Sequence, residues 1–191
     1  MITNLPNTKL IPNYTIAKLF LSYQVTSFHQ ACEYVWQLPY GRTSQNTQPL
    51  LVLKESKGTC SSKHALLKLL AEECSQYADN FSDIELVLGV YIMNEANSPG
   101  VGSVLSQYSL STIPEAHCFL RYHGQEYDFT RHFYQQQTPT PTFIFIHRLV
   151  ISPAEIGEKK NKIHKDFLQG HLNQFPLTKA WDIREECITA L

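Results

Sequence analysis

An amphipathic segment, residues 59–77, limits the possible folds of this chain more than any other feature. Its apolar residues recur every three or four positions, which is the spacing of one face of an α-helix. The apolar stripe comprises Ala65, Leu66, Leu69, Leu70, Cys74 and Tyr77, and four charged residues lie largely off it: Lys63, Lys68, Glu72 and Glu73. Thr59 can cap this helix, and Cys60 then falls in its first turn. The segment therefore predicts a long helix with a cysteine at its N-terminus.

Strands are predicted in the middle of the chain, where runs rich in β-branched and aromatic residues occur. The predicted strands are 84–93, 115–122, 125–130 and 143–150. The second and third flank His123 and Gly124, which suit a tight turn, so these two strands are expected to form a hairpin.

Helices are predicted on both sides of the strands. Thr26 or Ser27 can cap one of them, with Gln30 placed for a capping box behind Ser27. The tail 152–191 is expected to hold two helices, broken near Pro176. Two other segments are 15–23, which fits a helix or a strand, and 135–142, a Gln/Thr/Pro-rich spacer. Helices, then strands without helices between them, then helices predict an α+β fold with an antiparallel sheet.

The composition fits one globular domain. The chain has 191 residues, of which 43% are hydrophobic and 17% charged. We expect a single domain over 1–191, with a core at about 15–150 and a C-terminal helical extension at about 152–191. A net charge of -1 without a basic block argues against nucleic-acid binding.

The cellular location is also predicted from the sequence. The start of the chain lacks the pattern of a signal peptide, and no apolar run reaches the length of a membrane span. Five cysteines form an odd number without a disulfide spacing. We expect a cytoplasmic protein with mostly reduced thiols and no membrane partner, while the sequence leaves the oligomeric state unknown.

Cys60 is the candidate nucleophile. In the first turn of a helix, free backbone N–H groups and the helix dipole favour a negative charge. They lower the pKa of a thiol and so enrich the reactive thiolate. Gly58 allows a close approach or a sharp turn of the backbone just before it. The alternative for Cys60 taken alone is a packing role, as many free cysteines have.

A thiol nucleophile needs a base, and His117 with Asp128 forms the candidate pair. His117 lies near the start of a predicted strand, and Asp128 follows the hairpin turn. Folding the hairpin places residue 117 opposite about 130, and 128 opposite about 119, so both side chains share one face. A carboxylate there can fix the imidazole tautomer and stabilise the imidazolium. The alternative is a half-buried strand with a polar outer face.

The segment 58–65, GTCSSKHA, is similar to the nucleophile segment of transglutaminase-like proteins. The chain also has that family's order of cysteine, histidine and aspartate, at Cys60, His117 and Asp128. The similarity covers roughly residues 40–130. It implies a papain-like or transglutaminase-like core, in which the nucleophile helix packs on an antiparallel sheet with the histidine and aspartate on adjacent strands.

The resemblance implies acyl transfer through a thioester. Cys60 would attack an amide or ester carbonyl, His117 would move the proton and Asp128 would orient it. The Cys60 N–H and a donor from residues 40–45 would bind the oxyanion. The substrate would be a peptide or protein amide, or a small amide or amine, and the acceptor would be water or an amine. No cofactor and no metal ion is expected.

Three alternatives remain open. Cys60 and His64 are four residues apart and could bind zinc from one helix face, although paired CxxC knuckles are absent. Otherwise His64 is expected at the edge of the site or on the helix flank. A non-catalytic binding or scaffold protein could keep the same fold. A third alternative is another enzyme with the same Cys–His–Asp chemistry, such as an arylamine N-acetyltransferase or a peptide amidase.

Overall fold

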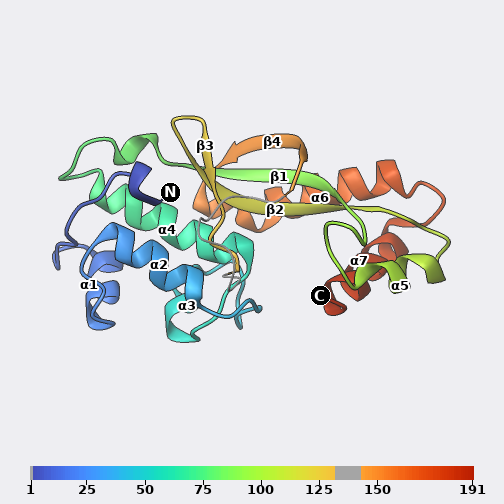
Figure 1. The fold of residues 1–191 in the computed structure, drawn as a ribbon, viewed down its shortest axis with the longest axis horizontal. Coiled ribbons are helices and arrows are strands. Elements are labelled where there is room, and N and C mark those ends of the chain that lie inside the picture. The colour runs from blue at the N-terminus through green and yellow to red at the C-terminus, as the bar shows by residue number, and fades with distance from the viewer. Residues whose placement is uncertain (1, 132–142) are drawn as a thin grey trace. The chain divides into compact units, whose positions relative to one another are not determined.

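The computed structural model describes residues 2–131 and 143–191, and these form an α+β fold (Figure 1). Its helices are η1 (Ile2–Asn4), α1 (Thr15–Ser22), α2 (Phe28–Gln37), α3 (Leu51–Lys54), α4 (Cys60–Cys74), η2 (Phe81–Asp83), α5 (Val101–Gln107), η3 (Pro153–Ile156), α6 (Glu158–His171) and α7 (Leu177–Thr189). Its strands are β1 (Glu85–Met93), β2 (Ile113–Tyr122), β3 (Gln125–Tyr127) and β4 (Phe145–Ile151). They form one antiparallel sheet of order β3-β2-β1-β4, which confirms the predicted α+β class with an antiparallel sheet. The predicted spacer 135–142 lies outside the described residues.

The chain divides into two compact units, each built from three separate segments. Unit 1 comprises the described residues of 1–87, 118–141 and 150–157, and unit 2 those of 88–117, 142–149 and 158–191. Strands β1, β2 and β4 each contribute residues to both units. Cys60 and Asp128 therefore belong to unit 1, and His117 belongs to unit 2.

In unit 1, α4 is the central helix and packs against α1, α2 and α3 (Figure 1). It also holds the start of α1, because the Glu73 carboxylate accepts hydrogen bonds from Ile16 N and Ala17 N, both at 2.8 Å. A carboxylate at a helix N-terminus accepts hydrogen bonds from free N–H groups and interacts favourably with the positive end of the helix dipole. Segment 15–23, for which the sequence allowed helix or strand, is thus fixed as a helix by a residue far along the chain.

The predicted cap of α2 is present in part. Ser27 is the N-cap residue, and its side chain accepts from Gln30 N. The side chain of Gln30 reaches back to Thr26, where it accepts from both the backbone N–H and the hydroxyl group at 2.8 Å. The predicted capping box behind Ser27 was therefore wrong by one residue, since Thr26 offers two donors to the same oxygen.

The predicted hairpin is confirmed in its turn and register. His123 and Gly124 have positive φ angles of 47° and 80°, and Leu120 pairs with Tyr127. Continuing this register places residue 128 opposite 119, as predicted. Strand β3 nevertheless ends at Tyr127 and not at residue 130 as predicted, because the backbone N–H groups that follow bond to side chains.

In unit 2, α7 packs against α5 and α6 (Figure 1). Pro176 is the N-cap of α7, which confirms the predicted break in the tail. Helix α5 lies between β1 and β2 in the chain, so the prediction of strands without helices between them was wrong. Its N-cap Gly100 has φ 107°, and a Cβ there would lie 2.7 Å from Ala190 O. Because this contact involves a residue near the end of the chain, the sequence around Gly100 does not predict it.

Candidate active site

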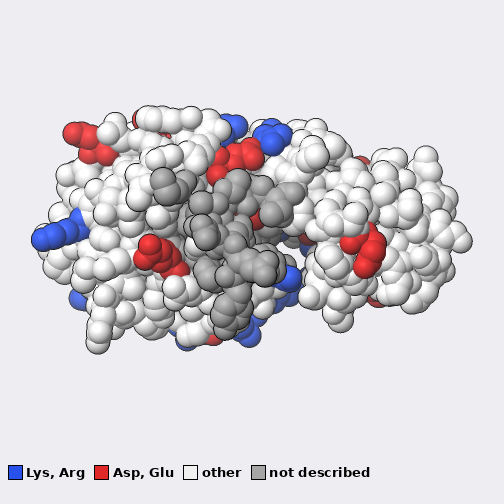
Figure 2. Space-filling model, in the orientation of Figure 1, with Lys and Arg blue, Asp and Glu red and all other residues white. Residues whose placement is uncertain are grey.

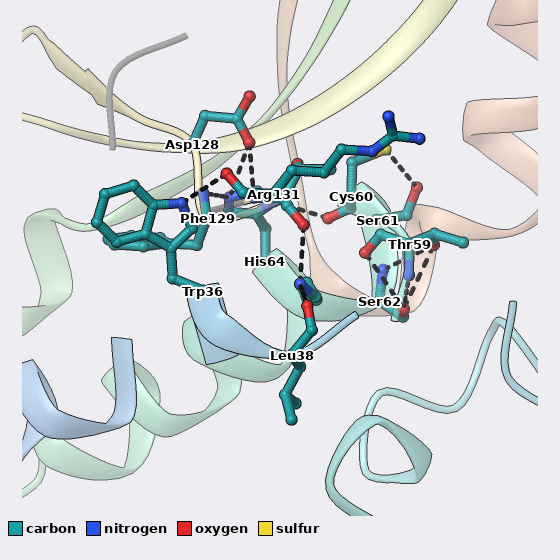
Figure 3. A network of polar contacts seen from close by, with 12 residues as sticks. Trp36, Leu38, Thr59, Cys60, Ser61, Ser62, His64, Asp128, Phe129 and Arg131 are labelled. Carbon is teal, nitrogen blue, oxygen red and sulfur yellow. Dashed lines mark hydrogen bonds and ion pairs between the residues drawn. The ribbon is translucent and has the colours of Figure 1, made fainter. Parts of the chain in front are cut away.

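Cys60 is the first residue of α4, and residues before and after it in the chain hold this helix N-terminus in place. Thr59 is the N-cap residue and forms a reciprocal capping box with Ser62. A Cβ on Gly58 would lie 2.8 Å from the Lys63 side chain, so only glycine fits this approach. The thiol is nearly buried, at 6% exposure, and its Sγ lies 3.8 Å from Ser61 Oγ (Figure 3). The sequence prediction of a capped helix with Cys60 in its first turn is confirmed.

Lys63 lies in the interior of unit 1, in contrast to its predicted place off the apolar stripe. Its side chain is fully buried, and Nζ donates to Leu38 O at 2.5 Å and to Thr130 O at 2.8 Å. Burial lowers the pKa of Lys63 to about 8, although the neighbouring Asp128 carboxylate opposes this shift. Burial thus extends beyond the predicted apolar stripe, because all residues of the first turns of α4 are buried.

His64 joins the start of α4 to the segment after β3. Its ring is fully buried, with Nδ1 2.7 Å from Cys60 O and Nε2 2.7 Å from Phe129 N (Figure 3). A carbonyl can only accept and an amide N–H can only donate, so Nδ1 carries the proton and Nε2 accepts. His64 is therefore neutral, and both of its nitrogens are engaged. The structure places it beside Cys60 and Asp128, in the interior, and not on an exposed flank of the helix.

Asp128 follows directly after β3 and lies close to His64. Its Oδ1 accepts from Thr130 N at 2.9 Å and is 3.7 Å from His64 Nε2. Because Nε2 uses its lone pair on Phe129 N–H, this second distance is a close approach and not an ion pair. The Asp128 side chain is 12% exposed. The structure thus brings Cys60 and Asp128 to opposite ends of one buried histidine.

Arg131 lies three residues beyond Asp128, and its main chain is anchored in the core. Its carbonyl accepts from Trp36 Nε1 at 2.8 Å (Figure 3). Its guanidinium lies over the Tyr40 ring, 4.4 Å from the ring centroid. Tyr40 in turn is bridged to Gly58, two residues before Cys60. The arginine and its aromatic support are therefore tied to the start of α4 through backbone contacts.

His117 lies on β2 in unit 2, among aromatic side chains. It is 7% exposed, and its ring centroid is 5.2 Å from that of Phe143 and 6.5 Å from that of Tyr91. Phe145 stacks on it at 6.2 Å. The role of His117 as base stays a prediction.

Unit 2 also buries a charged cluster that the sequence did not single out. Arg184 Nε donates to Glu115 Oε2 at 2.7 Å, and a second guanidinium nitrogen donates to Oε1. His164 Nε2 lies 3.5 Å from the same carboxylate. Burial alone raises the pKa of Glu115, but Arg184 and His164 outweigh it and hold that pKa at about 2. The cluster ties β2 to α6 and α7.

The segment 40–45 was expected to supply a second oxyanion donor. Three of its backbone N–H groups are already engaged. Gly41 N donates to Gly58 O, Thr43 N to the Asn46 side chain, and Ser44 N to the Glu55 carboxylate. These three groups therefore hold the loop in place and leave the choice of oxyanion donor to the remaining members of the segment.

The sequence did not predict the roles of three residues of this site: Lys63 as a buried cation, His64 as a buried bridge and Arg131 above the Tyr40 ring. The signal for the first two is the pair of polar residues directly after the capped cysteine. At the start of a central helix such residues face the interior whatever the apolar stripe indicates. For Arg131, only its nearness in sequence to Asp128 was visible.

Comparison with models of known protein families, with curated proteins and with solved structures finds no match. Among the described residues, no group of three or more His, Cys, Asp or Glu side chains could hold a metal ion. None of the described helices is long and apolar enough to cross a membrane. On the face drawn in Figure 2, Lys and Arg side chains of the described residues are scattered among Asp and Glu.

Proposed function

We propose that this chain is a thiol hydrolase or acyltransferase that acts on peptide-like amides, with a transglutaminase-like or papain-like catalytic arrangement. Cys60 is the nucleophile, His117 the base and Asp128 its orienting acid. The observation that supports this best is the setting of Cys60 as first residue of the capped helix α4, with Lys63 buried one turn on and the Asp128 segment fastened to it by His64.

This setting favours the thiolate of Cys60. The helix N-terminus carries partial positive charge, and the charge interaction between Cys60 and the Lys63 ammonium group raises the pKa of the lysine. A thiolate is the reactive form of cysteine in acyl transfer. His64 cannot act as the base, because its two nitrogens bond to backbone groups. The proposal therefore keeps His117 in that role.

The reaction would proceed in two halves. The Cys60 thiolate attacks the substrate carbonyl carbon and forms a C–S bond, while the carbonyl electron pair moves to the oxygen. The C–N bond then breaks, and the leaving amine takes a proton from the His117 imidazolium. In the second half, water or an amine gives its proton to His117 and attacks the thioester, and the thiolate leaves. Asp128 holds the imidazole in the required tautomer.

Zinc binding is a weaker candidate. It would need Cys60 and His64 as ligands from one helix face, and the lone pair of His64 Nε2 already accepts from Phe129 N–H. A metal ion would have to displace that backbone bond. A scaffold role predicts no chemistry at Cys60 at all, and the experiment below separates it from the enzyme.

The experiment is acylation by p-nitrophenyl acetate, followed by release of nitrophenolate and by intact mass. We expect one acetyl group per chain, located on Cys60, and turnover that Cys60→Ala abolishes. His117→Ala and Asp128→Asn should lower the acylation rate by about 10²-fold or more, the usual contribution of general acid–base catalysis. The matched control is Cys32→Ala, which removes another buried thiol of unit 1. Equal acetylation of Cys60→Ala and wild type would refute the enzyme.

A further inference from the structure

A positive charge without a carboxylate partner lies at the start of the nucleophile helix. The guanidinium of Arg131 stacks 4.4 Å above the Tyr40 ring, and Figure 3 shows its side chain extending toward the end of α4 that carries Cys60. Among the residues that the structure describes, no Asp or Glu forms an ion pair with this guanidinium. Two other arginines differ, since Arg121 pairs with Glu85 and Arg184 with Glu115, whereas Arg148 likewise lies over an aromatic ring, that of Phe145.

Near Cys60, the positive charges of Lys63 and Arg131 exceed the negative charge of Asp128. Lys63 has the carboxylate of Asp128 beside it, which raises its pKa, while Arg131 acts on the same lysine as a like charge and lowers that pKa. Asp128 also accepts from Thr130 N–H, and Phe129 N–H donates to the neutral His64. One acid and two cations are therefore gathered at this end of α4. When Cys60 is acylated it carries no charge, and the cluster is left with a net positive charge.

We propose that Arg131 binds a carboxylate of the acyl donor, so that the site takes anionic, peptide-like amides. A guanidinium that lies on an aromatic ring keeps its N–H groups in its own plane, where their edges can meet a planar carboxylate with two parallel hydrogen bonds. Tyr40 supplies the ring, and its bridge to Gly58 sets this edge beside the backbone that leads to Cys60. The inference rests on the proposed function, because it names the substrate of the same nucleophile.

The test compares two alkylating reagents of nearly equal shape, iodoacetate and iodoacetamide, on the native chain. In both, the Cys60 thiolate forms an S–C bond and iodide leaves with the electron pair of the C–I bond. Only iodoacetate carries a carboxylate. The measured quantity is the ratio of the two rates at Cys60, read by mass spectrometry and divided by the ratio for the same cysteine in the urea-unfolded chain.

We expect this normalised ratio to be about tenfold above one in the wild type, a factor that corresponds to about 1.4 kcal/mol. Arg131→Gln should return it to about one, and Arg131→Lys should fall between, since lysine keeps the charge but not the planar fork. Tyr40→Leu should lower the ratio through loss of the ring. Arg121→Gln is the matched control and should keep the wild-type ratio, because its guanidinium already pairs with Glu85.

The possible results separate this inference from the proposed function. Cys60 that reacts with neither reagent faster than in the unfolded chain refutes the nucleophile itself, and the inference with it. Enhanced reaction with iodoacetamide, together with a ratio that Arg131→Gln and Tyr40→Leu leave unchanged, overturns the carboxylate site while the nucleophile stands. Thermal unfolding of each variant shows whether the fold is intact. If Arg131→Gln does not fold, Tyr40→Leu and Arg131→Lys decide.

Discussion

Each unit buries one cluster of charged side chains, and the two clusters are compensated in different ways. In unit 2 the Glu115 carboxylate faces the Arg184 guanidinium and the His164 ring, so the buried anion meets a cation directly. In unit 1 the buried Lys63 donates to two backbone carbonyls, Leu38 O and Thr130 O, and Asp128 stands nearby. The buried ion pair between Glu115 and Arg184 links β2 to α7 and so stabilises the packing of these elements. A cation held by carbonyls keeps its field available to a neighbouring thiol.

The largest expected effect lies in the closed cluster of unit 2. Glu115→Gln removes the buried anion of Arg184, which keeps only the more exposed Glu185 as a partner, and breaking a buried pair from one side costs about 3–5 kcal/mol of unfolding free energy. Urea unfolding followed by circular dichroism measures it. The comparison also requires that Cys60 keep its alkylation rate in those molecules that stay folded. A loss below about 1 kcal/mol would show that Glu115 and Arg184 are weakly coupled.

The same cluster predicts how stability depends on acid. The pKa of Glu115 is held at about 2 in the folded chain, below its ordinary 4.5, so folding favours the charged carboxylate. Its contribution is fully present above pH 4.5 and is lost as the pH falls toward 2, on the order of 3 kcal/mol in total. Unfolding free energies between pH 5 and 3 should therefore fall more steeply in wild type than in Glu115→Gln. Parallel curves would contradict the assignment.

For Lys63 we expect a change of stability at alkaline pH, where the free energy of unfolding should rise with pH. Its pKa is lowered by burial to about 8, so the folded chain releases this proton before the unfolded chain does. The penalty of burying the charge is fully present below pH 8 and disappears as the pH rises toward 10.5, worth on the order of 3 kcal/mol. Lys63→Met lacks this rise, so the stability of wild type relative to the variant should increase as the pH is raised from 7 to 10. The substitution should also slow Cys60 alkylation at pH 7, since the ammonium group is lost.

His64 offers a smaller and more local test of unit 1. His64→Asn can still donate to Cys60 O but leaves Phe129 N–H without its acceptor, while His64→Gln does the reverse. Each lost buried partner should cost about 1–3 kcal/mol. His64→Leu should cost roughly the sum. If chemical denaturation finds His64→Leu as stable as wild type, the bridge between α4 and the Asp128 segment is not a stabilising element.

The smallest effect is expected for an exposed ion pair. Arg121 and Glu85 pair at 2.7 Å, but their side chains are 28% and 39% exposed. Arg121→Gln should change the unfolding free energy by less than about 1 kcal/mol, as for most surface pairs. An effect as large as that of Glu115→Gln, in the same denaturation assay, would remove the distinction between buried and exposed charge on which the comparison depends.

The sequence predicts those features that depend on neighbouring residues. The cap at Thr59, the turn at His123 and Gly124 and the break at Pro176 are all encoded within a few positions, and the structure has each of them. Strand β3 and helix α5 could not be bounded in this way. The first ends where Phe129 N bonds to His64, and the second starts on a glycine that contacts Ala190 O.

The candidate site was predictable to the same extent. Cys60 and Asp128 could be named from the helix start and the hairpin, whereas the burial of Lys63 depends on how other segments cover α4. Its partners Leu38 O and Thr130 O lie 25 and 67 residues away in the chain. A lysine next to an apolar stripe is normally solvated, so no local pattern indicates an interior cation.

The central claim is that Cys60 is a thiolate nucleophile served by His117, and the most direct measurement is iodoacetamide alkylation of the native chain across pH, read for each cysteine by mass spectrometry. We expect Cys60 near pH 6 to react far faster than Cys32, Cys74, Cys118 and Cys187, and His117→Ala to abolish this advantage. Burial raises the pKa of Cys32, Cys74 and Cys187, so these three serve as internal references. Reaction of Cys60 at the rate of the reference thiols would contradict the account.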